Sequence, residues 1–163
     1  MVNVIDNALS EDALRNIKKL LLPTGAGEFP WYCMSPITAG YDKEGGGYYF
    51  THNFYNNFEA SNWFGVVKPI LDILKPQALM RVKGNLYNST EKRVTHTPHK
   101  DYEFTHKGAI FSVNSNDGAT ILSDGTEIES VENRLLMFDP SELHSSTSCT
   151  NALCRVNINF NYF

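Results

Sequence analysis

Apolar residues recur at helical spacing near the start of the chain. Ser10 precedes a segment with acidic residues in its first turn and two lysines in its last turn. The apolar positions that share one helical face are Leu14, Ile17, Leu20 and Leu21. Because a Ser side chain can cap a helix and this order of charges complements the helix dipole, the pattern predicts a helix that Pro23 ends. Its apolar face is expected to pack on the rest of the molecule.

A second helical pattern covers residues 60–74 and ends before Pro76. Its apolar face consists of Trp63, Val66, Val67, Ile70, Leu71 and Leu74. After residue 78 the sequence shows only strand and turn patterns. Turn signals follow one another at intervals of about eight residues, the spacing typical of a double-sheet jelly roll; they are Asn116-Asp117-Gly118, Asp124-Gly125 and Glu132-Asn133. The expected fold is mainly β with flanking helices, a double-stranded β-helix (jelly roll).

The stretch between the two helical patterns is rich in glycine and aromatic residues. Residues 28–37 read as a strand broken by prolines, and residues 38–47 as a loop that ends in three glycines. The aromatic run Tyr48 to Tyr55 follows. It has two interpretations: a strand with rings packed on both sides, or a Gly-hinged lid or wall over a binding site.

Length and charge narrow the class of protein. With 163 residues and 18.4 kDa, the chain is expected to form one domain (1–163), with a helical and aromatic-loop part at 1–77 and a core at 78–163. A net charge of −4 and a pI near 5.7 disfavour a nucleic-acid partner. A local group of cations is either solvated or attracts a dicarboxylate; it comprises Lys83, Lys92, Arg93, Lys100 and Lys107.

The number and spacing of cysteines and the lack of long apolar runs bear on the cellular location of the protein. Three cysteines without a C-x-x-C pair indicate neither a disulfide framework nor a structural zinc site, so a reducing, cytoplasmic location is expected. No stretch approaches the roughly 18 apolar residues of a membrane span, and the N-terminus does not resemble an export signal. No membrane partner is therefore expected.

The candidate chemistry centres on His99-Lys100-Asp101. Residues i and i+2 of a strand point to one face, so His99 and Asp101 can offer an imidazole and a carboxylate to one metal ion. His96 does not share that face with Asp101, and His106 is too near in sequence to come from a returning strand. His144, after the turn that follows residues 135–140, is the expected third ligand. Two nitrogens and one oxygen with other positions open are typical of non-haem iron(II) oxygenases.

The order of these pieces resembles the 2-oxoglutarate- and Fe(II)-dependent oxygenase superfamily, in particular its prolyl 4-hydroxylase-like branch. Over residues 79–162 the sequence has a strand with Asn85-Leu86-Tyr87, the H-x-D triplet, a buried strand with a Pro-containing turn, His144, and then Arg155-Val156-Asn157. The resemblance implies His99, Asp101 and His144 as Fe(II) ligands. It also implies that Arg155 clamps the distal carboxylate of 2-oxoglutarate, that Tyr87 bonds the same cosubstrate, and that Asn85 and Asn157 assist.

The resemblance further implies a hydroxylase that consumes O2 and 2-oxoglutarate and releases succinate and CO2. Asp101 favours hydroxylation over halogenation, because halogenating relatives have Gly or Ala there. The expected substrate is a small molecule or a peptide, with a prolyl or peptidyl residue as one candidate. The alternative is a non-catalytic cupin-like module that binds a metal or small ligand, although the H-x-H motif usual in cupins is absent.

Overall fold

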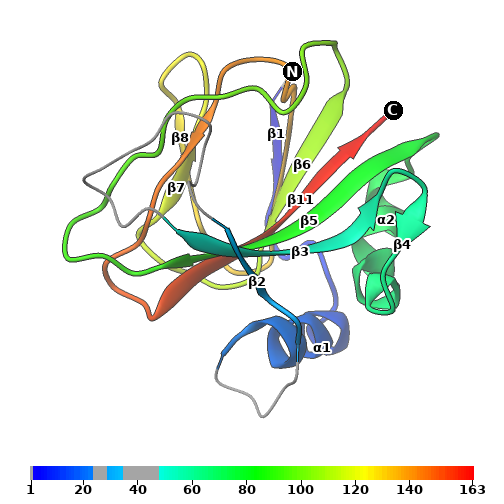
Figure 1. Cartoon of the computed structure of the whole chain (residues 1–163), viewed down its shortest axis with the longest axis horizontal. Coiled ribbons are helices and arrows are strands. Elements are labelled where there is room, and N and C mark those ends of the chain that lie inside the picture. The colour runs from blue at the N-terminus through cyan, green and yellow to red at the C-terminus, as the bar shows by residue number, and fades with distance from the viewer. Residues whose placement is uncertain (1, 24–28, 35–47) are drawn as a thin grey trace.

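The computed structural model describes residues 2–23, 29–34 and 48–163 (Figure 1). The first predicted helix is confirmed as α1 (Glu11–Leu21), and the Ser10 side chain accepts a hydrogen bond from the Ala13 amide. Ile17 and Leu21 are fully buried on the expected face. Burial of each such side chain contributes about 1.5–3 kcal/mol, which is enough to hold α1 against the sheet.

The helix expected over residues 60–74 is partly wrong. Instead, the structure has β4 (Glu59–Ala60), the 3₁₀ turn η1 (Phe64–Val67) and the short helix α2 (Lys68–Leu74). Pro69 lies in the first turn of α2, where its missing N–H costs nothing, but it cannot continue a helix that starts nine residues earlier, at residue 60. Ser61 also forms hydrogen bonds with the residues that follow it. Its hydroxyl accepts a hydrogen bond from the Trp63 amide, and its carbonyl accepts one from the Phe64 amide. These local bonds favour a turn.

The larger sheet has the strand order β1-β9-β6-β11-β5-β3-β2, and β4 pairs with β3. All pairings within it are antiparallel. Its strands are β1 (Asn3–Ile5), β2 (Tyr32–Met34), β3 (Tyr49–Asn56), β5 (Leu79–Asn88), β6 (Lys107–Ser112), β9 (Arg134–Phe138) and β11 (Cys154–Tyr162). Strands from both ends of the chain thus join one sheet. The division into parts 1–77 and 78–163 stays a prediction.

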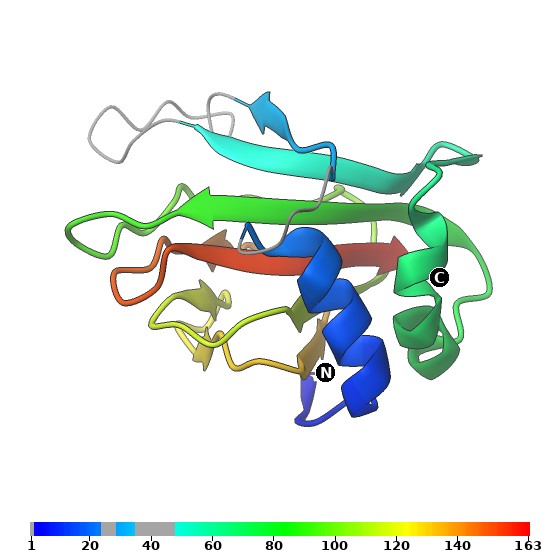
Figure 2. The ribbon, with the colours of Figure 1, turned by 90° about the horizontal axis from the view of Figure 1, so that it is seen from below.

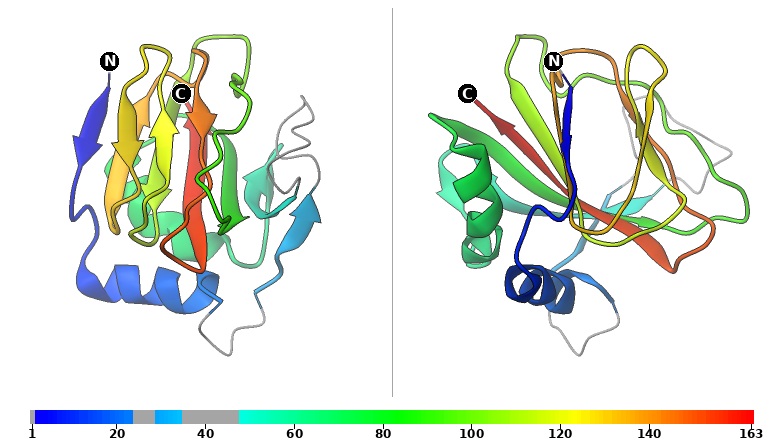
Figure 3. Two further views of the ribbon diagram at one scale, coloured as in Figure 1. Left: turned by 90° about the vertical axis from the view of Figure 1, so that its left-hand side faces the viewer. Right: turned by 180° about the vertical axis from the view of Figure 1, so that it is seen from behind.

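The smaller sheet has the order β10-β7-β8 and lies opposite the larger one (Figure 3). Its strands are β7 (Ala119–Ile121), β8 (Glu127–Glu129) and β10 (Ser145–Ser146). Isolated bridges between Thr95 and Thr147 and between His99 and His144 extend it toward the segment before β6. The predicted turns separate β6, β7, β8 and β9, so the expected jelly roll is confirmed.

The two faces of β11 have opposite character. Val156, Ile158 and Phe160 belong to the main apolar core, which α1 and α2 cover from outside the sandwich (Figure 2). The alternate residues Arg155, Asn157, Asn159 and Asn161 are buried too. Because alternate side chains of a strand point to opposite faces, these four face the space between the sheets. The interior of the sandwich is therefore polar along its central strand.

The aromatic run is a strand, β3, with Tyr49 and Phe54 buried. The run is therefore not a lid, but it does form a wall, because Tyr49 and Thr51 line a cavity on the inner side of the sheet. Residues 38–47, which were to form the hinge, lie outside the described residues. Of the strand expected over residues 28–37, the described part contains β2. Within the described residues, no helix is both long and apolar enough to cross a membrane.

Candidate metal centre

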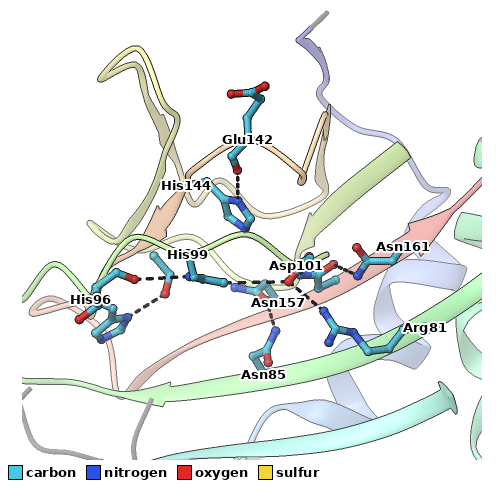
Figure 4. Close-up of polar contacts among 12 residues, drawn as sticks. Arg81, Asn85, His96, His99, Asp101, Glu142, His144, Asn157 and Asn161 are labelled. Carbon is cyan, nitrogen blue, oxygen red and sulfur yellow. Dashed lines mark hydrogen bonds and ion pairs between the residues drawn. The ribbon is translucent and has the colours of Figure 1, made fainter. Parts of the chain in front are cut away.

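His99, Asp101 and His144 are brought together between the two sheets, and their ligand atoms lie within 4.8 Å of one another (Figure 4). An antiparallel bridge holds the two histidines: the His99 amide donates to the His144 carbonyl at 2.9 Å, and the His144 amide donates back at 3.0 Å. The Asp101 amide donates to the Pro140 carbonyl at 2.9 Å. Backbone hydrogen bonds to the segment from Pro140 to His144 thus bring all three side chains together.

The H-x-D triplet does not lie on a regular strand, contrary to expectation. Only His99 takes part in a bridge, and Asp101 lies in a bend. The chain leaves the smaller sheet here to cross toward β6, and the backbone bond from Asp101 to Pro140 replaces the ladder of a continuous strand. The two side chains still reach the same place, since their ligand atoms and that of His144 lie within 4.8 Å of one another.

Hydrogen bonds orient both imidazoles for metal binding. His144 Nδ1 lies 3.0 Å from the Glu142 carbonyl oxygen, and His99 Nδ1 lies 3.4 Å from that of Thr97. Since a carbonyl can only accept, each Nδ1 carries the proton and each Nε2 has a free lone pair. Burial, followed by the nearby His144, lowers the pKa of His99 and favours its neutral form. This donor set fits a divalent metal ion.

Asp101 is held in its ionised form by neighbours that the sequence did not single out. Its two oxygens accept hydrogen bonds from Arg81 Nη2 at 2.8 Å and from Asn159 Nδ2 at 3.1 Å. Burial by itself would raise the pKa of Asp101, but its neighbours, first the Arg81 guanidinium and also the hydrogen bond from Asn159, hold that pKa below its ordinary value. Each carboxylate oxygen has a second lone pair, so Asp101 can still bind a metal.

Arg155 is a buried cation without a protein anion among the described residues. Its side chain points inward, as expected, and only 1% of the residue is exposed. The guanidinium donates to neutral acceptors only: Ser130 Oγ at 2.7 Å, the Thr147 carbonyl at 3.1 Å and Thr120 Oγ1 at 3.0 Å. Burying an unpaired charge costs several kcal/mol. This site is therefore suited to an anionic ligand.

Tyr87, Asn85 and Asn157 line the interior between Arg155 and the metal ligands. The register of β5 and β11 places Tyr87 opposite Arg155, whose guanidinium carbon lies 5.7 Å from the centroid of the tyrosine ring. The same register places Asn85 opposite Asn157, and Asn85 Nδ2 donates to Asn157 Oδ1 at 3.0 Å. Asn85 Oδ1 is buried and has no hydrogen-bond partner in the part of the chain that the structure describes. Burial raises the pKa of Tyr87, so its phenol stays a donor at neutral pH.

The sequence reasoning missed Arg81, Asn159 and Asn161. Asn161 donates to Asn159 Oδ1 at 3.1 Å and its own Oδ1 lies 2.7 Å from His106 Nε2, so a polar row supports Asp101 from behind. The signal was present in the sequence: the alternation of β11 puts every second residue from Arg155 onward on the same face. Arg81 likewise shares its face of β5 with Asn85 and Tyr87.

The three other histidines have separate surroundings. His96 Nδ1 lies 2.7 Å from Ser146 Oγ, and its ring stacks on Tyr87. His106 bonds Asn161 and the Phe104 carbonyl. His52 lies on β3, 3.0 Å from both the Pro30 carbonyl and Ser61 Oγ. None of them belongs to the His99–Asp101–His144 group.

No family model matches the sequence, and no curated protein is significantly similar to it. Solved structures match over nearly the whole chain. The viral collagen prolyl hydroxylase vCPH from Paramecium bursaria Chlorella virus-1, a 2OG complex, has a TM-score of 0.63 at 12% identity and covers 98% of this chain and 94% of its own. A prolyl hydroxylase from Trichoplax adhaerens, in complex with a hypoxia inducible factor peptide fragment, has a TM-score of 0.67 at 11% identity and covers 99% and 83%.

A third similar structure is not a prolyl hydroxylase. The non-heme alpha ketoglutarate dependent epimerase SnoN from nogalamycin biosynthesis has a TM-score of 0.66 at 11% identity, covering 99% of this chain and 77% of its own. Structural similarity at sequence identities this low supports a shared fold but does not identify the substrate. Together with the double antiparallel sheet, they show that this chain has the double-stranded β-helix fold of the 2-oxoglutarate- and Fe(II)-dependent oxygenases.

Proposed function

We propose that the protein is a 2-oxoglutarate-dependent dioxygenase that uses non-haem Fe(II) and O2 to hydroxylate a small molecule or a peptide. The observation that carries the proposal is the donor group itself. Two imidazoles and one carboxylate lie within 4.8 Å of one another, and both imidazoles present an unprotonated Nε2. A ligand set of this type leaves coordination positions open for other groups.

The cosubstrate assignment is supported by the charge on Arg155. A dicarboxylate that reaches from the metal to Arg155 would supply the anion that this guanidinium lacks among the described residues. The planar guanidinium of Arg can bond a carboxylate through two parallel N–H groups. Tyr87, Asn85 and Asn157 lie along the same path and offer a phenol and two amides.

His99, His144 and a carboxylate oxygen of Asp101 would hold the metal. When bound, Fe(II) and 2-oxoglutarate together supply the activation of O2, with succinate and CO2 as the coproducts. Arg81 and Asn159 keep Asp101 ionised and oriented, and the backbone carbonyls of Thr97 and Glu142 fix the imidazole tautomers. Arg155 and Tyr87 would orient the cosubstrate and exclude water from the buried end of the site.

A prolyl or peptidyl residue is one candidate for the hydroxylated group within this proposal. The fold is shared with two prolyl hydroxylases, one of them in complex with a peptide fragment. The likeness to an epimerase shows that other outcomes occur on the same fold. Hydroxylation is proposed because Asp101 supplies a carboxylate ligand where a halide would otherwise bind.

Anaerobic titration of Fe(II) into the protein with 2-oxoglutarate tests the proposal. Chelation of the keto acid by iron produces a weak visible charge-transfer band, which we expect in the wild type. His99→Ala should abolish the band, and Arg155→Met should lower the apparent affinity for 2-oxoglutarate at least about tenfold, because a charge-assisted bond of roughly 1.5–3 kcal/mol is lost.

Two matched variants serve as controls. Lys100→Ala changes the residue between the two ligands, whose side chain instead bonds Glu103 at the surface, and should keep the band. Arg93→Met removes a surface guanidinium that pairs with Glu127 and should leave the 2-oxoglutarate affinity unchanged. Bound iron without any band would contradict the proposal and favour the non-catalytic metal-binding module.

A further inference from the structure

A cavity of about 610 Å³ opens on the inner side of β2, β3 and β5, and its described lining includes Tyr102, the residue after the metal ligand Asp101. Its walls include the rings of Tyr32, Tyr49 and Tyr102 and the side chains of Thr51, Arg81 and Lys83. Arg81 connects the cavity to the metal group, because its Nη2 donates to Asp101 at 2.8 Å. The volume lies in the range of pockets that hold small organic molecules, roughly 300–1,000 Å³.

The described lining of this cavity contains two cations and no carboxylate. Arg81 Nη2 donates to Asp101, and its Nε is buried without a hydrogen-bond partner among the described residues. Lys83 has no hydrogen bond or ion pair to any described residue, and its Nζ lies 5.8 Å from the centroid of the Tyr49 ring. Both side chains therefore have unused capacity to bind an anion.

Lys83 differs in this respect from the other cations that the sequence groups with it. Arg93 pairs with Glu127 and Lys100 with Glu103, while Lys92 and Lys107 are exposed to solvent. Lys83 instead is half-buried on the inward face of β5, where partial burial lowers the pKa of its ammonium to about 8. Its charge is retained at neutral pH at a desolvation cost that a bound anion would offset.

2-Oxoglutarate bound at Arg155 would leave the end of the polar interior near Lys83 and Arg81 free. The register pairs Arg155 with Tyr87 and Asn161 with Arg81, so Arg155 and Arg81 lie at opposite ends of the polar interior, with Asn157 and Asn159 between them. Lys83 pairs with Asn159, four residues along β11 from Arg155, a span of about 13 Å. The distal carboxylate of a 2-oxoglutarate bound at Arg155 therefore does not reach Lys83, which leaves Lys83 available to a second anion.

We propose that the substrate is a small molecule carrying a carboxylate or a phosphate, which Lys83 and Arg81 bind in this cavity while Tyr49 and Tyr102 flank its body. The assignment rests on the proposed function, which supplies the metal and the cosubstrate next to the cavity. The aromatic walls favour a flat or apolar body attached to the anionic group. Binding through Lys83 would place that body beside Asp101 and thus beside the reacting centre.

Binding of matched probe pairs tests the assignment. The wild-type protein is held anaerobically with Fe(II) and saturating 2-oxoglutarate, so that the cosubstrate blocks the Arg155 end. 4-Hydroxyphenylacetate is compared with 4-hydroxyphenylacetamide, and phenyl phosphate with phenol, by calorimetric titration. We expect the acid of at least one pair to bind at least about tenfold more tightly than its neutral partner, as one charge-assisted bond provides. The pair with the larger ratio identifies carboxylate or phosphate as the preferred anion.

Substitutions at Lys83 assign the preference to the cavity. Lys83→Met should reduce the acid-to-neutral ratio to within about twofold, whereas Lys83→Arg keeps the charge and should keep most of the ratio. Lys107→Met, on the exposed start of β6, should leave the ratio as in the wild type. A ratio near one in the wild type, a ratio that survives Lys83→Met, or no binding of either acid up to about 10 mM would overturn the inference.

The charge-transfer band of the same samples separates the two proposals. A band together with equal binding of acids and neutral partners overturns the substrate assignment alone. Absence of the band overturns the proposed function and, with it, the assignment of the cavity to a substrate.

Discussion

Arg155 shows how much one residue of this interior depends on its immediate neighbours. Its guanidinium is positioned by Ser130, Thr120 and the Thr147 carbonyl, which come from three different segments of the chain. Behind its aliphatic stem lies Gly118, where an added Cβ would be 2.7 Å from Arg155 Cδ and 2.8 Å from Asn116 Oδ1. Glycine is required here because the stem of Arg155 occupies the space of a side chain.

Gly118→Ala should therefore displace Arg155. We expect a loss of about 1–3 kcal/mol in the free energy of unfolding from overpacking, measured by urea denaturation. The affinity for 2-oxoglutarate should fall at least about threefold, because the clamp moves by a few tenths of an ångström. Gly65→Ala is the control, since nothing lies within 4 Å of its added Cβ. An unchanged 2-oxoglutarate affinity in a destabilised Gly118→Ala protein would show that Arg155 does not orient the cosubstrate.

Among the elements, the segment that connects β1 to α1 is bonded to the turn before β9 by one asparagine side chain. Asn133, in the turn between β8 and β9, accepts a hydrogen bond from the Leu9 amide and donates one to the Leu9 carbonyl, both at 2.9 Å. It adopts a left-handed backbone with φ of 62°. Asn tolerates this conformation better than most residues, so one side chain satisfies both the turn and the connection before α1.

Asn133→Ala should destabilise the protein by about 2–4 kcal/mol, the sum of two lost hydrogen bonds and left-handed strain. Asn133→Gly removes the bonds but accepts the backbone conformation, so its loss should be smaller by about 1 kcal/mol. Urea denaturation followed by far-UV circular dichroism measures both. Wild-type stability of Asn133→Gly would mean that the bonds to Leu9 do not hold the N-terminal elements in place.

At the scale of the whole molecule, the sandwich combines an apolar core on one side of the larger sheet with a polar interior on the other. The polar interior contains Arg81, Lys83 and Arg155 but only one described carboxylate in contact with them, that of Asp101. Positive charges buried in excess destabilise the folded state. Anionic ligands that enter this space should therefore stabilise the entire fold.

Thermal unfolding should accordingly shift when the site is filled. A divalent metal with 2-oxoglutarate, at about a thousand times its dissociation constant, adds roughly 4 kcal/mol, which corresponds to a rise of about 10 °C in Tm for a chain of this size. Differential scanning calorimetry under anaerobic conditions measures the shift. His99→Ala should lose most of it, whereas Lys100→Ala should keep it. An equal shift in wild type and His99→Ala would place the binding elsewhere.

The sequence by itself determined the features that depend on local patterns. The capped helix α1, the strand content after residue 78, the turns that separate β6 to β9 and the H-x-D triplet each follow from residues close together in the chain. The alternation of β11 placed Arg155 on the face opposite Val156, Ile158 and Phe160, and the resemblance to the oxygenase superfamily implied that this face points inward, as it does. The second helix was predicted too long because local bonds of Ser61 and the position of Pro69 outweigh an apolar pattern.

Only the tertiary structure decided which polar residues meet. Strand register, set by hydrogen bonds between segments distant in sequence, places Tyr87 opposite Arg155 and Asn85 opposite Asn157. It also brings Arg81 to Asp101 and places Lys83 in the interior, while the other cations of the same sequence group remain at the surface. A strand pattern tells which residues share a face, but a neighbouring strand decides what that face contacts, because partners and register are properties of the whole sheet.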